Sequence, residues 1–153
     1  MMKKILSCIA VSKFLITTGG TTGYAKVKKS EILDFSEKNE FQCADWVDYP
    51  IDVYDATGGL VGQVPVICGG DSGDSLFHDE CYKVTGNKAV FLGKMKTKRY
   101  AAASVVLNDS VLWVTGGFNG IRLSSTEFIY SNGMISNGNS GCRSFDIKWS
   151  FKF

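Results

Sequence analysis

The stretch VLWVTGGFNG, residues 111–120, joins a short apolar run to two consecutive glycines. So short an apolar run suits a strand that is buried on both faces, and it is too short for a helix. Paired glycines adopt backbone conformations that a Cβ atom forbids, and they let a neighbouring segment approach closely. The stretch therefore predicts a buried strand that ends in a tight turn.

The same pattern occurs twice earlier in the chain. KFLITTGG begins at Lys13 and VPVICGG begins at Val64, so the glycine pairs recur about every 50 residues. The register extends upstream, because YDATGGLV (54–61) aligns with YAAASVVL (100–107). A glutamate follows each glycine pair by about ten residues: Glu31, Glu80 and Glu127. We expect each carboxylate to accept hydrogen bonds from nearby backbone or from a neighbouring side chain.

Each unit predicts four short strands. A small-residue strand comes first, and a tight turn such as Gly62-Gln63 or 108–110 connects it to the apolar strand. A loop then leads to a third strand that carries the glutamate. The fourth strand is expected around Trp46 in the first unit and at Val90-Phe91 in the second. The first unit has no recognisable first strand.

A repeat of this length with a strand that ends in Gly-Gly resembles the kelch repeat, whose units are four-stranded blades of a β-propeller. The resemblance covers residues 13 to about 130 and departs from the family pattern in two ways. Val53 stands where the third unit has Arg99, and Val90 stands where kelch units often carry Trp. The resemblance implies an all-β fold, a partial kelch-type β-propeller of antiparallel four-stranded blades. About three units amount to half of a six-bladed ring.

The resemblance sets the boundaries of the chain's parts. The units cover about 13–49, 50–95 and 96–130, and a divergent tail follows over 131–153. Residues 1–12 have the short basic and apolar regions of a signal-like leader, with a small-x-small site that ends at Ser12. No apolar run approaches the ~18 residues of a membrane span. A net charge of +2 gives no global field that favours nucleic acid.

Five cysteines are present, and loss of the leader would leave four, a number compatible with disulfides outside the cell. Cys68 ends one predicted strand and Cys81 begins the next, so a cross-strand disulfide and two buried free thiols both fit. Asn108 begins a glycosylation sequon. Together these features favour a secreted protein over a cytoplasmic one.

The loop GGDSGDSLFHDE (69–80) contains fragments of several catalytic motifs. Ser72 and Ser75 stand in protease-like and esterase-like tetrapeptides, but the single histidine, His78, lies in the same loop and no other can serve as a base. The carboxylates of this loop are those of a solvated acidic loop rather than of a calcium site. One histidine also excludes the copper site of galactose oxidase-like propellers. The sequence therefore predicts no catalytic residue, no metal and no cofactor.

The predicted role is a binding module, not an enzyme, that recognises a protein partner of unknown identity through its propeller loops. The loops 71–79 and 118–125 carry the candidate partner-binding residues, which are Phe77, His78, Phe118, Asn119 and Arg122. Self-association would complete the ring. The alternatives are a fragment of a secreted carbohydrate-binding or galactose oxidase-like propeller, and a truncated chain with no independent function.

Overall fold

The computed structural model describes residues 47–138 in full, and before residue 47 it describes only the strands. Within this part of the chain there are fourteen strands and no helix. Almost all of them belong to three four-stranded antiparallel sheets, each of which pairs its strands in chain order. The one exception is the small hairpin of β3 (Thr21–Thr22) and β4 (Ala25–Lys26), which is inserted in the first sheet between β2 and β5.

The strands of the three sheets follow the repeat. The first sheet contains β1 (Cys8–Val11), β2 (Phe14–Thr18), β5 (Ser30–Asp34) and β6 (Gln42–Asp45). The second contains β7 (Thr57–Val61), β8 (Val64–Cys68), β9 (Glu80–Thr85) and β10 (Lys88–Lys94). The third contains β11 (Ala103–Leu107), β12 (Val111–Thr115), β13 (Thr126–Tyr130) and β14 (Ile135–Asn137).

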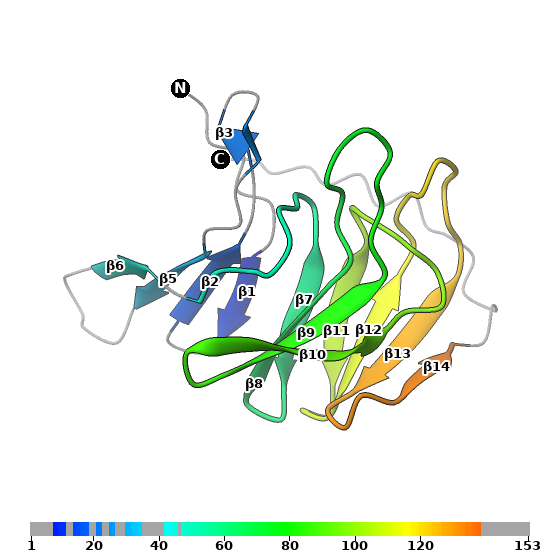
Figure 1. The fold of residues 1–153 in the computed structure, drawn as a ribbon. Coiled ribbons are helices and arrows are strands. Elements are labelled where there is room, and N and C mark those ends of the chain that lie inside the picture. The colour runs from blue at the N-terminus through cyan, green and yellow to red at the C-terminus, as the bar shows by residue number, and fades with distance from the viewer. Residues whose placement is uncertain are drawn as a thin grey trace, which may run out of the picture.

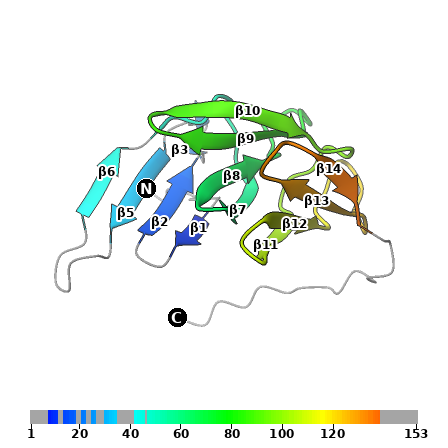
Figure 2. The ribbon, with the colours of Figure 1, turned by 90° about the horizontal axis from the view of Figure 1, so that it is seen from below.

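The sheets are arranged as blades. The first strand of the second sheet, β7, contacts the first strands of both neighbouring sheets, β1 and β11. The last strands β6, β10 and β14 lie at the outside, so the sheets fan out from their first strands (Figures 1 and 2). This arrangement is a partial β-propeller-like fold, which confirms the predicted all-β class of antiparallel four-stranded blades.

Two strands lie where the sequence did not indicate them. β1 gives the first unit the first strand that was not recognised, and it falls within the segment 1–12 that has leader-like composition. β14 pairs with β13 and falls within the segment 131–153 that the sequence set apart as a tail. The third sheet is therefore a complete four-stranded unit that reaches Asn137.

The core lies between the second and third sheets. Alternate residues of β8 and β12 point to the same inter-sheet layer, in which Val66, Leu112 and Val114 are buried with Val61 and Ile129. A second, smaller cluster lies on the other face of the second sheet, around Tyr49, Val53 and Ile67. The second sheet is therefore apolar on both faces, as expected for a blade that is covered on both sides.

In the second and third units, the second glycine of the pair is required where the connection between two sheets passes close to the end of the apolar strand. Gly70 has a φ of 108°, and a Cβ atom there would lie 2.8 Å from the Cβ of Val53. Gly117 has a φ of 93°, and a Cβ atom there would lie 2.7 Å from the carbonyl oxygen of Tyr100. Both the backbone conformation and the lack of space exclude other residues.

Candidate functional site

Two long loops meet the inter-sheet connections at one end of the blades, the upper end in Figure 1. The loop after β8 pairs with the connection into β7 through mutual backbone hydrogen bonds of Tyr54 and Asp71, at 3.0 and 3.1 Å. The loop after β12 pairs in the same way with the connection into β11, through Tyr100 and Phe118, both at 3.0 Å. Both loops therefore make the same backbone pairing with a connection, and this pairing holds them on the same surface.

Four aromatic rings from these segments form a cluster on that surface, which we call the aromatic cluster. Phe77 stacks on Tyr100 at 5.3 Å between ring centroids, and Phe118 meets Tyr100 edge-to-face at 5.7 Å. Phe118 also meets Phe77 edge-to-face at 6.5 Å, and Tyr54 meets Tyr100 at 6.3 Å. All four rings are partly exposed. The cluster therefore fixes the two loops against each other and also presents aromatic surface to solvent.

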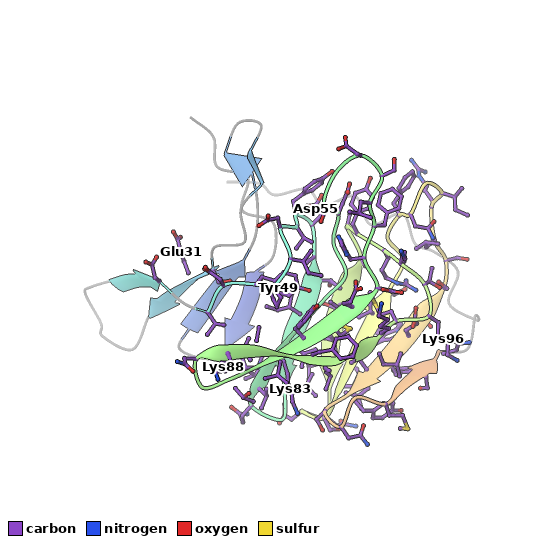
Figure 3. All side chains as sticks on the ribbon, viewed as in Figure 1. Glu31, Tyr49, Asp55, Lys83, Lys88 and Lys96 are labelled. Carbon is purple, nitrogen blue, oxygen red and sulfur yellow. A yellow bond between two sulfur atoms is a disulfide. The ribbon has the colours of Figure 1, made fainter. Side chains whose placement is uncertain are left out.

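Large apolar side chains flank this cluster. Leu76 is 54% exposed and Ile121 is 69% exposed, each at the tip of one of the two loops. Arg122 is also exposed, next to Ile121. We call the aromatic cluster together with Leu76, Ile121 and Arg122 the upper face. Figure 3 shows side chains crowded at this end, near Asp55, whereas Lys83 and Lys88 lie at the opposite end.

The five predicted partner-binding residues fall in different positions on this face. Phe77 and Phe118 are brought together in the aromatic cluster, and Arg122 is exposed as expected. Asn119 is partly exposed, and its backbone N–H donates to the carbonyl of Ile121 at 3.2 Å. His78 points inward, with its side chain only 13% exposed. Sequence reasoning missed Tyr54, Tyr100, Leu76 and Ile121, although the two tyrosines occupy equivalent positions of the repeat.

His78 lies between a hydroxyl and a carboxylate. Its Nε2 atom is 2.7 Å from the Oγ atom of Ser72, and its Nδ1 atom is 3.3 Å from Oε2 of Glu80. The Ser72 hydroxyl is also 2.7 Å from the carbonyl oxygen of Asp52. Serine, histidine and carboxylate thus stand in the order found in hydrolytic triads, although the sequence predicts no catalytic residue in this loop.

The surroundings of Ser72 lack the further parts of a nucleophilic site. The N–H of Ser72 donates to the carbonyl of Leu76 at 3.0 Å, and the N–H of Gly73 donates to the Asp71 carboxylate at 2.6 Å. These two amides are therefore not available to stabilise an oxyanion. The hydroxyl has one proton, which it can give to only one of Asp52 and His78. We interpret the array as a brace that ties the loop to the neighbouring connection.

Glu80 completes this brace from the start of β9. Its Oε1 atom accepts a hydrogen bond from Nζ of Lys94 at 3.0 Å. Burial alone raises the pKa of Glu80, but hydrogen bonds from Lys94, from backbone and from His78, with the Lys94 charge, lower it to about 2. Glu80 is therefore ionised at neutral pH and accepts hydrogen bonds, as the repeat predicted.

The equivalent glutamate of the third unit, Glu127, is buried and binds a buried arginine. Its Oε1 atom is 2.7 Å from an Nη atom of Arg99, and both residues are 1% exposed. Glu127 also accepts the backbone N–H groups of Lys96 and Thr97, at 2.6 and 3.1 Å. Arg99 donates further to the carbonyls of Gly116 and Ser125. This network joins the connection 95–102 to both ends of the loop after β12.

The second unit has Val53 in place of Arg99, and the structure explains the consequence. Val53 is fully buried against Gly70 and belongs to the smaller core cluster. Without an arginine in this position, Glu80 is bound by Lys94 of its own sheet instead. The same position of the repeat therefore stabilises one loop by an ionic network and the other by apolar packing.

Asp71 has a structural role at the base of its loop. It is buried, and its carboxylate accepts hydrogen bonds from the Tyr54 hydroxyl and from the N–H of Gly73. The hydrogen bond to Asp71, followed by burial and neighbouring charges, raises the pKa of Tyr54 to about 12. Among the described residues, no group of three or more His, Cys, Asp or Glu side chains is placed to hold a metal ion.

Cys68 and Cys81 form a disulfide between directly opposite positions of β8 and β9. Both residues are fully buried in the layer between the second and third sheets. Of the two options that the sequence left open, the structure has the cross-strand bond. Asn108, the glycosylation candidate, is exposed in the turn between β11 and β12, at the end of the blades opposite the upper face. In the part of the chain that the structure describes, no helix is long and apolar enough to cross a membrane.

Comparisons with known proteins identify a similar fold but no family. No family model matches the chain, and no curated protein matches it. Among solved structures, the chain is similar to YjhT, with a TM-score of 0.75 and 13% sequence identity. The match covers 87% of this chain and 44% of that chain, so the chain spans about half the length of YjhT. At this identity the likeness supports the fold alone.

Proposed function

We propose that this chain is a kelch-type propeller module that binds a protein partner through its upper face. The observation that carries the proposal is that two loops with equivalent backbone pairing place the exposed side chains of Leu76 and Ile121 around the aromatic cluster. Interfaces in proteins are enriched in aromatic residues and arginine at their centres. Tyr100, Phe118 and Arg122 supply these residue types on one surface.

Rigidity supports the same proposal. The loops are held by the disulfide, by the Arg99–Glu127 network and by the brace at His78. A surface whose side chains are already ordered loses less conformational entropy when a partner binds. The upper face is therefore suited to recognition, whereas the bonded amides around Ser72 give no support to catalysis.

The test compares captured proteins between three forms of the chain. A photo-crosslinking amino acid is placed at Asn119, within the upper face, and crosslinked proteins from native extract are quantified by mass spectrometry. The double variant Leu76→Ser with Ile121→Ser removes the exposed apolar side chains of the loop tips. The matched control, Val90→Ser with Phe91→Ser, removes side chains that are 40% and 52% exposed on β10.

The proposal expects one or a few proteins that crosslink to the unaltered chain and to the control but at least about tenfold less to the loop variant. Tenfold corresponds to about 1.4 kcal/mol, which is within the effect of losing an interface anchor. If every crosslinked protein is recovered equally from all three forms, the upper face does not recognise a partner.

A further inference from the structure

The third sheet has one face that no other described part of the chain covers. Its residues alternate, so that Val106, Leu112, Val114 and Ile129 point to the second sheet and are packed there. The intervening residues belong to the opposite face, which we call the open face. The open face contains Val105, Leu107, Val111, Trp113, Phe128 and Tyr130.

The open face is apolar and partly exposed. Val105 is 48% exposed and Leu107 is 39% exposed, whereas the large rings of Trp113, Phe128 and Tyr130 are half-buried. The three rings line an open hollow of about 410 Å³, together with Thr126, Ser136, Asn137 and Gly138. A contiguous apolar surface of this kind marks an interaction site in a soluble protein.

The repeat indicates what kind of structure covers such a face. The open face corresponds, one unit later, to the face of the second sheet that packs on the third sheet. Val66 aligns with Trp113, and Cys81 aligns with Phe128. Val66 and Cys81 are buried, at 1% and 0% exposure, because a neighbouring sheet covers them. By this correspondence, the open face is the face on which a further four-stranded sheet would pack.

The first sheet of the same chain is a sheet of the required type. It precedes the second sheet as the second precedes the third, so one of its faces is the face that a preceding blade would cover. Ala10, Leu15, Leu33 and Cys43 form one register row across its four strands, and all four residues of this row are apolar. Propellers close with four to eight blades, and two chains of three sheets contain six.

We propose that the open face binds the first sheet of a second copy of this chain, so that two chains close one ring by two equal head-to-tail contacts. Each copy then covers the other's open face, and the association stops at two because the ring is closed. The contact uses sheet faces and is separate from the upper face, so either proposal can fail without the other.

The test is the native mass of the full chain by light scattering over a hundredfold range of concentration. The proposal expects a discrete species of twice the 16.7 kDa chain mass. Val105→Lys should weaken the dimer at least about tenfold, because it places a charge in a buried apolar contact. Phe91→Lys, at a position 52% exposed on β10, is the matched control and should leave the dimer unchanged. Thermal unfolding of each variant verifies that the subunit is folded.

A mixing experiment distinguishes the head-to-tail ring from other dimers. Leu15→Lys in the first sheet should also dissociate the dimer. An equal mixture of the Leu15→Lys and Val105→Lys chains should recover a dimer, because the open face of the first chain and the first sheet of the second chain are both unaltered. A dimer in which two open faces meet would be insensitive to Leu15→Lys. A monomer at all concentrations, a dimer insensitive to Val105→Lys, or an aggregate of undefined mass would overturn the proposal.

Discussion

Glu127→Gln is the substitution that most sharply tests how the repeat positions its loops. The change keeps the size of the side chain but removes the charge that faces Arg99, which is 1% exposed and has its closest carboxylate oxygen at 2.7 Å. A buried charge that loses its partner costs about 3–5 kcal/mol. For a chain of this length each kcal/mol lowers the unfolding temperature by roughly 2–4 °C, so we expect a decrease of roughly 6–20 °C.

The chain provides a matched control in the equivalent glutamate. Glu80→Gln changes the same residue type at the same position of the repeat, but Glu80 is 22% exposed and its cationic partner Lys94 is 56% exposed. Water screens such a pair, so the loss should be much smaller. The double variant Glu127→Gln with Arg99→Met removes both buried groups and should recover part of the stability lost in the single variant.

The assay is urea unfolding followed by circular dichroism and by tryptophan fluorescence, with coincident transitions taken as the sign of two-state behaviour. A loss of less than about 1 kcal/mol in Glu127→Gln, the value of an ordinary hydrogen bond, would show that the buried ion pair does not hold the loop. Equal destabilisation by Glu80→Gln, or a double variant that loses the sum of two independent effects, would show the same.

Three further predictions follow from the site. Replacing both Cys68 and Cys81 by Ala should lower the free energy of unfolding by about 3 kcal/mol, because the bond closes a loop across 13 positions; equal urea midpoints with and without the bond would contradict this. The pKa of Glu80 falls from 4.5 to about 2 on folding, so its contribution is complete above pH 4.5 and is lost as the pH falls toward 2; stability measured over this range should decline less in Glu80→Gln. Gly117→Ala should destabilise far more than Gly120→Ala, since both residues have positive φ but only Gly117 lacks space for a Cβ atom; similar melting temperatures would show that the close approach to Tyr100 is unimportant.

The strands could be predicted from the glycine pairs because the structure requires glycine at these positions. At Gly70 and Gly117 the positive φ and the close approach of a neighbouring segment both exclude a Cβ atom, so the requirement is visible in the sequence. β1 could not be recognised, because the short apolar run at Cys8–Val11 fits a leader segment as well as a strand. β14 is only three residues long and joins the sheet through backbone pairing with β13, which needs no particular side chains.

The positions of the two loops could be predicted in outline, but their internal structure could not. The loops 71–79 and 118–125 and the residues Phe77, Phe118 and Arg122 follow from the repeat and lie on the upper face. The orientation of His78 does not follow from the sequence, because spacing alone cannot show that a loop folds back to place it against Ser72. The role of Arg99 was visible only as a difference from Val53, since its acceptors come from residues distant in sequence.

Amide hydrogen exchange of the full chain shows whether the repeat forms ordered sheets in solution. We expect the slowest exchange in β8, β12 and β13, whose strands pair on both sides, and faster exchange at the loop tips around Leu76 and Ile121. Uniformly fast exchange from residue 57 to residue 130 would mean that this chain does not form its sheets in solution, and the fold described above would be wrong.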